Sequence, residues 1–107
     1  MDDEDLLAVL GEKYSLELLR ATHEPRSARE VSDHLDIPIA TCYRRIEALV
    51  EAGLLEEVGR QLSDRGRRSS VYRRTVDEVV LSFDGEDVDL STSDRAVPNG
   101  VDRPRDR

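Results

Sequence analysis

Residues 36–57 read DIPIATCYRRIEALVEAGLLEE, and their spacing decides the fold. Three apolar residues in this stretch are separated by four and then three positions: Cys42, Ile46 and Leu49. That spacing is typical of the buried face of a helix. Pro38 suits the first turn of such a helix, and Gly53 is the residue type that commonly ends one. The pattern predicts a helix over about 39–52.

A shorter helix is predicted just before this one. Ser27 and Glu30 have the three-residue spacing of a capping box, in which each side chain satisfies a backbone N–H at the helix start. Three apolar residues then share one helical face: Ala28, Val31 and Leu35. We expect this helix to end near Asp36, because Pro38 disfavours helical geometry in the residue before it. Two short helices joined by a tight turn are the plan of a helix-turn-helix.

The N-terminal segment supplies a third helix. Apolar residues recur there at helical spacing: Leu6, Leu7, Leu10, Tyr14, Leu18 and Leu19. Gly11 interrupts the run. We therefore expect a short turn followed by a helix over about 12–23.

The outer face of the 39–52 helix is the first candidate binding surface. With Cys42 pointing inward at 100° per residue, four residues point most directly outward: Ala40, Arg44, Glu47 and Glu51. Thr41, Tyr43 and Arg45 flank that line, with Arg45 nearer the inner side. A recognition helix contacts bases through its N-terminal residues, arginine can donate two bonds to guanine, and the threonine methyl can touch thymine. The competing interpretation is a solvated face of a structural helix.

The next segment favours nucleic acid. Residues 54–62 and 70–75 are strand-like, and the sequence SDRGRRS between them contains the turn residues Asp64 and Gly66. Six arginines lie in the span 60–74, at positions 60, 65, 67, 68, 73 and 74, against the single acid Asp64. The local charge is therefore +5 in a chain of net charge −8. Such a patch is the electrostatic footprint of a phosphate-backbone partner.

The overall composition sets bounds on the protein. A chain of 107 residues forms one domain with a small core. Charged residues make up 37%, acids exceed bases, and Lys13 is the only lysine. This composition suggests a surface adapted to concentrated salt, although an ordinary acidic protein is the alternative.

Several classes of protein and of site are not supported by the sequence. No apolar run approaches the ~20 residues needed to cross a bilayer, and the acidic N-terminus is unlike a signal peptide, so we expect a cytoplasmic protein without membrane contact. Cys42 has no disulfide partner, and His23 and His34 are isolated from it in sequence, whereas zinc needs about three or four ligands. We expect no metal and no cofactor. No phosphate loop, His–Glu pair or activated nucleophile indicates an enzyme.

The segment DEVVLSFDGEDVDLS, in residues 77–91, predicts an appended hairpin over 77–90. Asp84-Gly85 is a strong two-residue turn signal. The expected cross-strand pairs are Phe83 with Glu86, Leu81 with Val88, and Val79 with Leu90, which puts the apolar residues on one face. A helix beginning at Thr75 is the alternative. Residues 91–107 are nearly devoid of apolar residues and are predicted to be a disordered tail.

The order SAREVSDHLDIPIATCYRRIEALVEAGLLEE, an arginine-rich hairpin and VYRRT resembles the winged helix-turn-helix transcription regulators of the ArsR-like type. It is particularly similar to small regulators of salt-loving archaea, and the resemblance covers roughly residues 8–76. It implies a DNA-binding regulator, usually a homodimer, with Thr41, Tyr43 and Arg44 in the major groove. It also implies that Arg65, Arg67 and Arg68 lie on a wing along the backbone or minor groove. The family commonly has Ser or Thr where Pro38 stands.

The predicted fold is thus α+β: a winged helix-turn-helix of three helices plus a β-wing over 1–76, followed by a C-terminal β-hairpin. The predicted function is sequence-specific binding of double-stranded DNA, with the recognition helix at about 39–52 and the wing at 63–70. The DNA-binding residues are expected to be Ala40, Thr41, Tyr43, Arg44, Arg45, Arg65, Arg67 and Arg68. The alternatives are a winged-helix protein-interaction module and an accessory domain of a nucleic-acid enzyme. We expect a homodimer formed through the hairpin together with Leu6, Leu7 and Leu10.

Overall fold

The computed structural model describes residues 2–62 and 68–94. The helices are α1 (Asp3–Leu10), α2 (Ser15–Ala21), α3 (Ala28–Leu35) and α4 (Ile39–Glu51). The strands are β1 (Arg26–Ser27), β2 (Leu55–Leu62), β3 (Arg68–Arg74), β4 (Val76–Asp84) and β5 (Asp87–Asp94). The α+β winged helix-turn-helix with an appended hairpin is confirmed.

The predicted capping box fixes the start of α3. The Glu30 backbone N–H donates to Ser27 Oγ at 3.1 Å, and the Ser27 N–H donates to Glu30 Oε1 at 2.8 Å. At the other end Asp36 adopts a left-handed conformation with φ 58°. Ser32 Oγ then donates to the Ile37 carbonyl at 2.6 Å, and the Ile37 N–H donates to the Ser32 carbonyl at 3.1 Å. These bonds hold the turn that sets α4 against α3.

Helix α4 runs from Ile39 to Glu51, within a residue of the prediction. Gly53 follows Ala52, the C-cap of α4, and has φ 80°. Residues with a side chain rarely adopt this conformation, whereas glycine does so readily. The three residues predicted to face inward are all buried: Cys42, Ile46 and Leu49. The predicted rotation of α4 about its axis is therefore correct.

The N-terminal region differs from the prediction. Residues 3–10 form the complete helix α1 instead of a short turn, and the next helix is confined to Ser15–Ala21. Asp2 caps α1 by accepting from the Asp5 N–H at 2.9 Å. The acids of its first turn also interact favourably with the positive end of the helix dipole, and this stabilises a helix that has no fully buried residue.

The core lies between the helices and the small sheet. Twelve buried residues form it: Leu18, Leu19, Ala21, Ala28, Val31, Ile37, Cys42, Ile46, Leu49, Leu54, Leu55 and Val76. The wing strands β2 and β3 pair in antiparallel fashion, and the short β1 pairs with the other side of β3, giving the order β1-β3-β2. Leu55 at the start of β2 and Val76 at the start of β4 thus pack with the helices in one core.

The C-terminal hairpin is present, but its predicted register is wrong by two residues. Phe83 pairs with Val88 and Leu81 with Leu90, because the turn is Gly85-Glu86 and not Asp84-Gly85. Only Gly85, with φ 62°, has a positive φ in this turn. Glycine at the first central position satisfies a type II′ turn, whereas the predicted turn required a positive φ at Asp84. A shift of two leaves the apolar residues on one face.

The hairpin is also longer than predicted. Strand β5 continues to Asp94, so residues 91–94, assigned to the tail in the prediction, pair with β4. Ser93 aligns with Glu78, and its hydroxyl donates to the Glu78 carboxylate at 3.4 Å. Polar side chains that bury little surface can thus still join a strand ladder. The remainder of the predicted tail, 95–107, lies outside the described residues.

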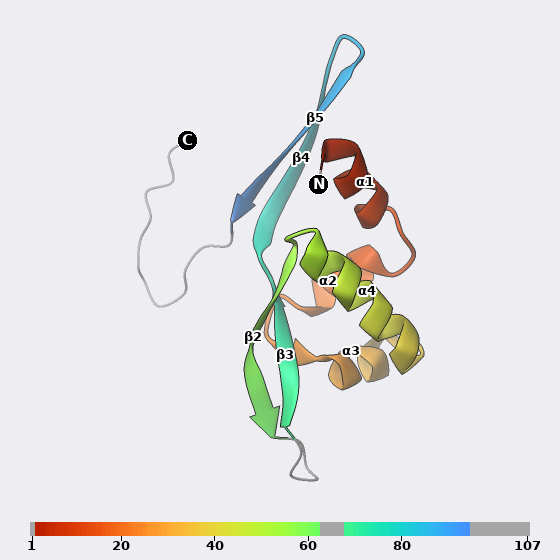
Figure 1. The fold of residues 1–107 in the computed structure, drawn as a ribbon, viewed down its shortest axis with the longest axis vertical. Helices are drawn as coiled ribbons and strands as arrows, with labels where there is room; N and C mark the ends of the chain where they lie inside the picture. The colour runs from red at the N-terminus through yellow and green to blue at the C-terminus, as the bar shows by residue number, and fades with distance from the viewer. Residues whose placement is uncertain (1, 63–67, 95–107) are drawn as a thin grey trace.

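Figure 1 shows how the two hairpins are arranged. The wing of β2 and β3 extends from one end of the molecule, and the β4–β5 ribbon extends from the other, with the helices along one side. Helix α1 lies beside the ribbon, and the Leu90 N–H donates to Asp3 Oδ2 at 3.0 Å. The ribbon is thereby attached to the N-terminal helix as well as to the wing.

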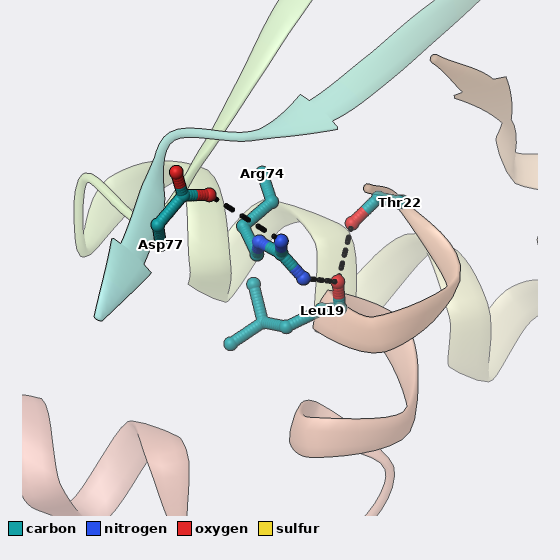
Figure 2. A network of polar contacts seen from close by, with 4 residues as sticks. All are labelled: Leu19, Thr22, Arg74 and Asp77. Carbon is teal, nitrogen blue, oxygen red and sulfur yellow. Dashed lines mark hydrogen bonds and ion pairs between the residues drawn. The ribbon is translucent and has the colours of Figure 1, made fainter. Parts of the chain in front are cut away.

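The junction between wing and ribbon is held by Arg74 (Figure 2). Its guanidinium donates to the Leu19 carbonyl at 3.3 Å and lies 3.5 Å from Asp77 Oδ1. The Thr22 hydroxyl also donates to Leu19 O, and the Arg74 N–H donates to Thr22 O at 2.8 Å. One arginine therefore connects the end of α2 with β3 and the start of β4.

Candidate nucleic-acid interface

The first half of the outer face of α4 is exposed. Ala40, Tyr43 and Arg44 are accessible to solvent, Tyr43 with 55% of its surface, and Thr41 is half-buried. Arg44 Nη2 lies 3.4 Å from Thr41 Oγ1. The first turn contains no acid, and Pro38 at its start provides no side-chain cap. This part of the helix therefore presents the hydroxyls of Thr41 and Tyr43 and the guanidinium of Arg44, with no carboxylate in the first helical turn.

Arg45 is placed differently from Arg44. Its Nη1 lies 2.6 Å from Glu12 Oε1, and only 21% of its side chain is exposed. Glu12 belongs to the connection between α1 and α2, 33 positions away in sequence. The sequence did not associate this carboxylate with α4, and no local spacing signal could have done so.

The wing is only partly described. Arg68 begins β3 and is exposed, whereas Arg65 and Arg67 lie outside the described residues. In the strand register Arg60 is opposite Ser70, and Leu62 is opposite Arg68. Arg60 and Arg68 consequently share one face of the wing, and Arg60 is exposed. Arg60 was not among the predicted contact residues, although the period-two alternation of the strand could have indicated it.

Two arginines counted in the +5 patch have acidic partners inside the protein. Arg73 Nη2 lies 3.4 Å from Glu56 Oε2 across the β2–β3 ladder. Arg74 is engaged by Leu19 and Asp77 at the junction described above. The cationic surface of the wing is therefore narrower than the sequence count implies, and its described part is centred on Arg60 and Arg68.

Charge is segregated along the molecule. The ribbon residues 76–94 include seven Asp or Glu and no Lys or Arg. Helix α1 adds the acids of its first turn beside the ribbon. The acidic ribbon and the wing, to which Arg60 and Arg68 belong, thus extend from opposite ends of the molecule (Figure 1).

Cys42 is an interior residue. Its side chain has 0% exposure, and its thiol donates to the Ala28 carbonyl at 3.4 Å. Burial raises the pKa of the Cys42 thiol, which disfavours the reactive thiolate. In residues 2–62 and 68–94, no three His, Cys, Asp or Glu side chains are grouped closely enough to hold a metal ion.

The expected self-association surface is only partly available. Leu6 and Leu10 pack against the core of their own chain. The ribbon, by contrast, exposes 71% of Phe83 and 43% of Leu81, on the face that the register assigns to the apolar residues. Of the two predicted parts of this surface, the ribbon and not α1 therefore carries exposed large apolar side chains.

None of the helices in the described part of the chain is long and apolar enough to span a membrane.

Comparisons with known proteins agree with this geometry. Residues 10–58 match the model of a family described as a helix-turn-helix domain. The fold is similar to that of a possible transcriptional regulator from Methanosarcina mazei Go1, with a TM-score of 0.53 and 20% identity. That similarity covers 69% of this chain and 66% of the other, so it spans just under two thirds of the archaeal chain. No curated protein matches the sequence.

The matched residues include the buried face of α4, the capping box of α3 and the turn between the two helices. They end in β2, at the start of the wing. Residues 10–58 are therefore similar to the helix-turn-helix domain family over the two helices of the motif and the first strand of the wing.

Proposed function

We propose that the protein regulates transcription by binding double-stranded DNA in a sequence-specific manner, with the N-terminal half of α4 in the major groove. The observation that carries this proposal is the exposed, acid-free outer face of α4 from Ala40 to Arg44. In this arrangement Arg44 and Thr41 read base edges, and Tyr43 and Ala40 contact bases or sugars beside them. Arg45, on the inner flank, contacts a phosphate.

The wing supplies contacts that do not depend on sequence. Arg60 and Arg68 share a face of the β2–β3 hairpin, and the neighbouring Arg65 and Arg67 add to the same cationic segment. We assign these arginines to phosphates or to the minor groove. Phosphate contacts position a protein on the duplex without specifying a base.

The segregation of charge supports this orientation. A chain of net charge −8 is repelled by DNA on average. The seven acids of the ribbon belong to the end opposite the wing, and this separation lessens their repulsion of a duplex that approaches the wing.

We further propose that the protein acts as a homodimer. Phe83 and Leu81 are exposed on the apolar face of the β4–β5 ribbon, and a two-stranded ribbon is only marginally stable by itself. Pairing two ribbons would cover these side chains and present two recognition helices to a two-fold symmetric site. The ribbon acids oppose the pairing, so we expect the dimer to be favoured by salt.

The same acid excess, with a single lysine, supports a surface adapted to concentrated salt in the cytoplasm of its cell. Carboxylates that repel one another in dilute buffer are screened at molar salt, where the Debye length is about 3 Å. We therefore propose that the fold gains stability as salt is raised.

Selection from a random-sequence duplex library at fixed salt tests the proposed function. We expect enrichment of a defined site, with two inverted half-sites if the dimer binds, and affinity that falls as salt rises. A library that emerges without enrichment, together with capture of an acidic protein by the outer face of α4, would support the protein-interaction alternative instead.

A further inference from the structure

The side chain of Arg45 is held by a carboxylate that belongs to another part of the chain. Arg45 Nη1 and Glu12 Oε1 are 2.6 Å apart, which is a charge-assisted hydrogen bond. Arg44, one residue away on the same helix, is exposed and has no such partner among the described residues. Two adjacent arginines of the recognition helix are therefore in different electrostatic states.

Glu12 is presented by an ordered turn. Its N–H donates to the Val9 carbonyl at 3.2 Å, and its own carbonyl accepts from the Ser15 N–H at 3.1 Å. The Ser15 hydroxyl also donates to Val9 O at 2.7 Å. These bonds fix the connection between α1 and α2, so the Glu12 carboxylate is held beside the middle of α4.

We propose that Glu12 is a positioning residue that competes with DNA phosphate for Arg45. The inference rests on the proposed DNA-binding function and extends it. In the free protein the Glu12 carboxylate neutralises the guanidinium of Arg45. A phosphate can bind Arg45 only by displacing Glu12, and the freed carboxylate then takes up a cation from solution. The contact consequently releases no net counterion, and Glu12 weakens binding to all DNA sequences alike.

The test measures binding of a random-sequence duplex as a function of salt for Glu12→Gln. We expect its affinity to rise about two- to fivefold at fixed salt, the range expected for breaking a solvent-accessible ion pair. The slope of log affinity against log salt should become steeper by about one unit, because the Arg45 contact then releases a counterion. Glu17→Gln is the matched control, since Glu17 is an exposed acid of the neighbouring helix α2. It should leave the slope unchanged.

The variant Arg45→Gln separates competition from a general effect of charge. If Glu12 acts through Arg45, Glu12→Gln has no effect on affinity or slope in the Arg45→Gln background. An increase that persists in that background, or a Glu12→Gln protein with unchanged or weaker binding, would overturn the inference. Arg68→Ala distinguishes failure of this inference from failure of the proposed DNA-binding function. If it weakens binding while Glu12→Gln does nothing, only the inference fails; if the wild-type protein binds no duplex, the proposed function fails.

Discussion

Replacing Arg74 with methionine separates arginines that hold the fold from those that we propose to contact DNA. Methionine keeps much of the aliphatic stem but removes the donors to Leu19 O and the ion pair with Asp77 (Figure 2). A hydrogen bond from a charged donor contributes about 1.5–3 kcal/mol. The lower end applies here, because the bond is 3.3 Å long and Leu19 O keeps the Thr22 hydroxyl.

The ion pair adds little to this figure. The Asp77 side chain is 44% exposed, so solvent screening limits its contribution to below about 1 kcal/mol. We therefore expect Arg74→Met to lower the free energy of unfolding by about 1.5–2 kcal/mol. For a domain of this size each kcal/mol corresponds to a fall in melting temperature of about 4–8 °C.

Urea unfolding of Arg74→Met and of the control Arg68→Met measures the difference. Arg68 is exposed on the wing, and its replacement should change stability by less than about 0.5 kcal/mol. For DNA binding we expect the larger effect in the other variant. Arg68→Met should lower the magnitude of the slope of log affinity against log salt by about one unit, and Arg74→Met should leave this slope unchanged. Equal unfolding midpoints for Arg74→Met and wild type would refute the structural role assigned to Arg74.

Five further outcomes are expected. Cys42→Ala should cost about 1 kcal/mol or more through lost packing without altering metal content, and stoichiometric zinc lost in that variant would contradict the interior role. Because burial raises the thiol pKa, wild-type stability should decline as pH rises above the pKa of the unfolded thiol, and Cys42→Ala should lack this decline. Ser27→Ala should cost about 0.5–2 kcal/mol by chemical denaturation, and no loss would contradict the capping box. The pair Arg67→Ala and Arg68→Ala should weaken binding to all duplexes similarly. Phe83→Asp should yield monomers by light scattering at molar salt, and a persistent dimer would place the interface elsewhere.

The helix-turn-helix could be predicted from sequence because its signals are local. The capping box of Ser27 and Glu30, the turn before Pro38 and the glycine after α4 each act within a few residues. The buried spacing of Cys42, Ile46 and Leu49 then fixes which face of α4 is outward. These features needed no knowledge of distant contacts.

The ribbon shows where local signals become ambiguous. Both Asp84-Gly85 and Gly85-Glu86 can form a two-residue turn. The first needs a positive φ at both residues, whereas the second needs it only at Gly85. The apolar alternation cannot distinguish them, because a shift of two residues preserves the faces of the strands.

Polar partners that lie far apart in the sequence could not be predicted. Glu12 reaches Arg45, and Leu19 reaches Arg74, across separations of 33 and 55 residues. A count of arginines therefore overestimates the free cationic surface. Helix α1 was missed for a different reason: Gly11 was interpreted as a break in an apolar run, whereas it follows a helix that begins at its Asp2 cap.

If Arg44 reads a base from the exposed half of α4, its side chain must contribute to the ratio of cognate to random affinity. The cognate site is the one recovered by selection, and both affinities are measured at the same salt concentration. We predict that Arg44→Ala costs about 1–3 kcal/mol at the cognate site and relaxes preference at one base position, with a much smaller loss on random DNA. Arg45→Ala should weaken both duplexes alike and leave the ratio unchanged. An unchanged ratio in Arg44→Ala would show that Arg44 reads no base, and a ratio that collapses only in Arg45→Ala would place the base-reading face one residue away.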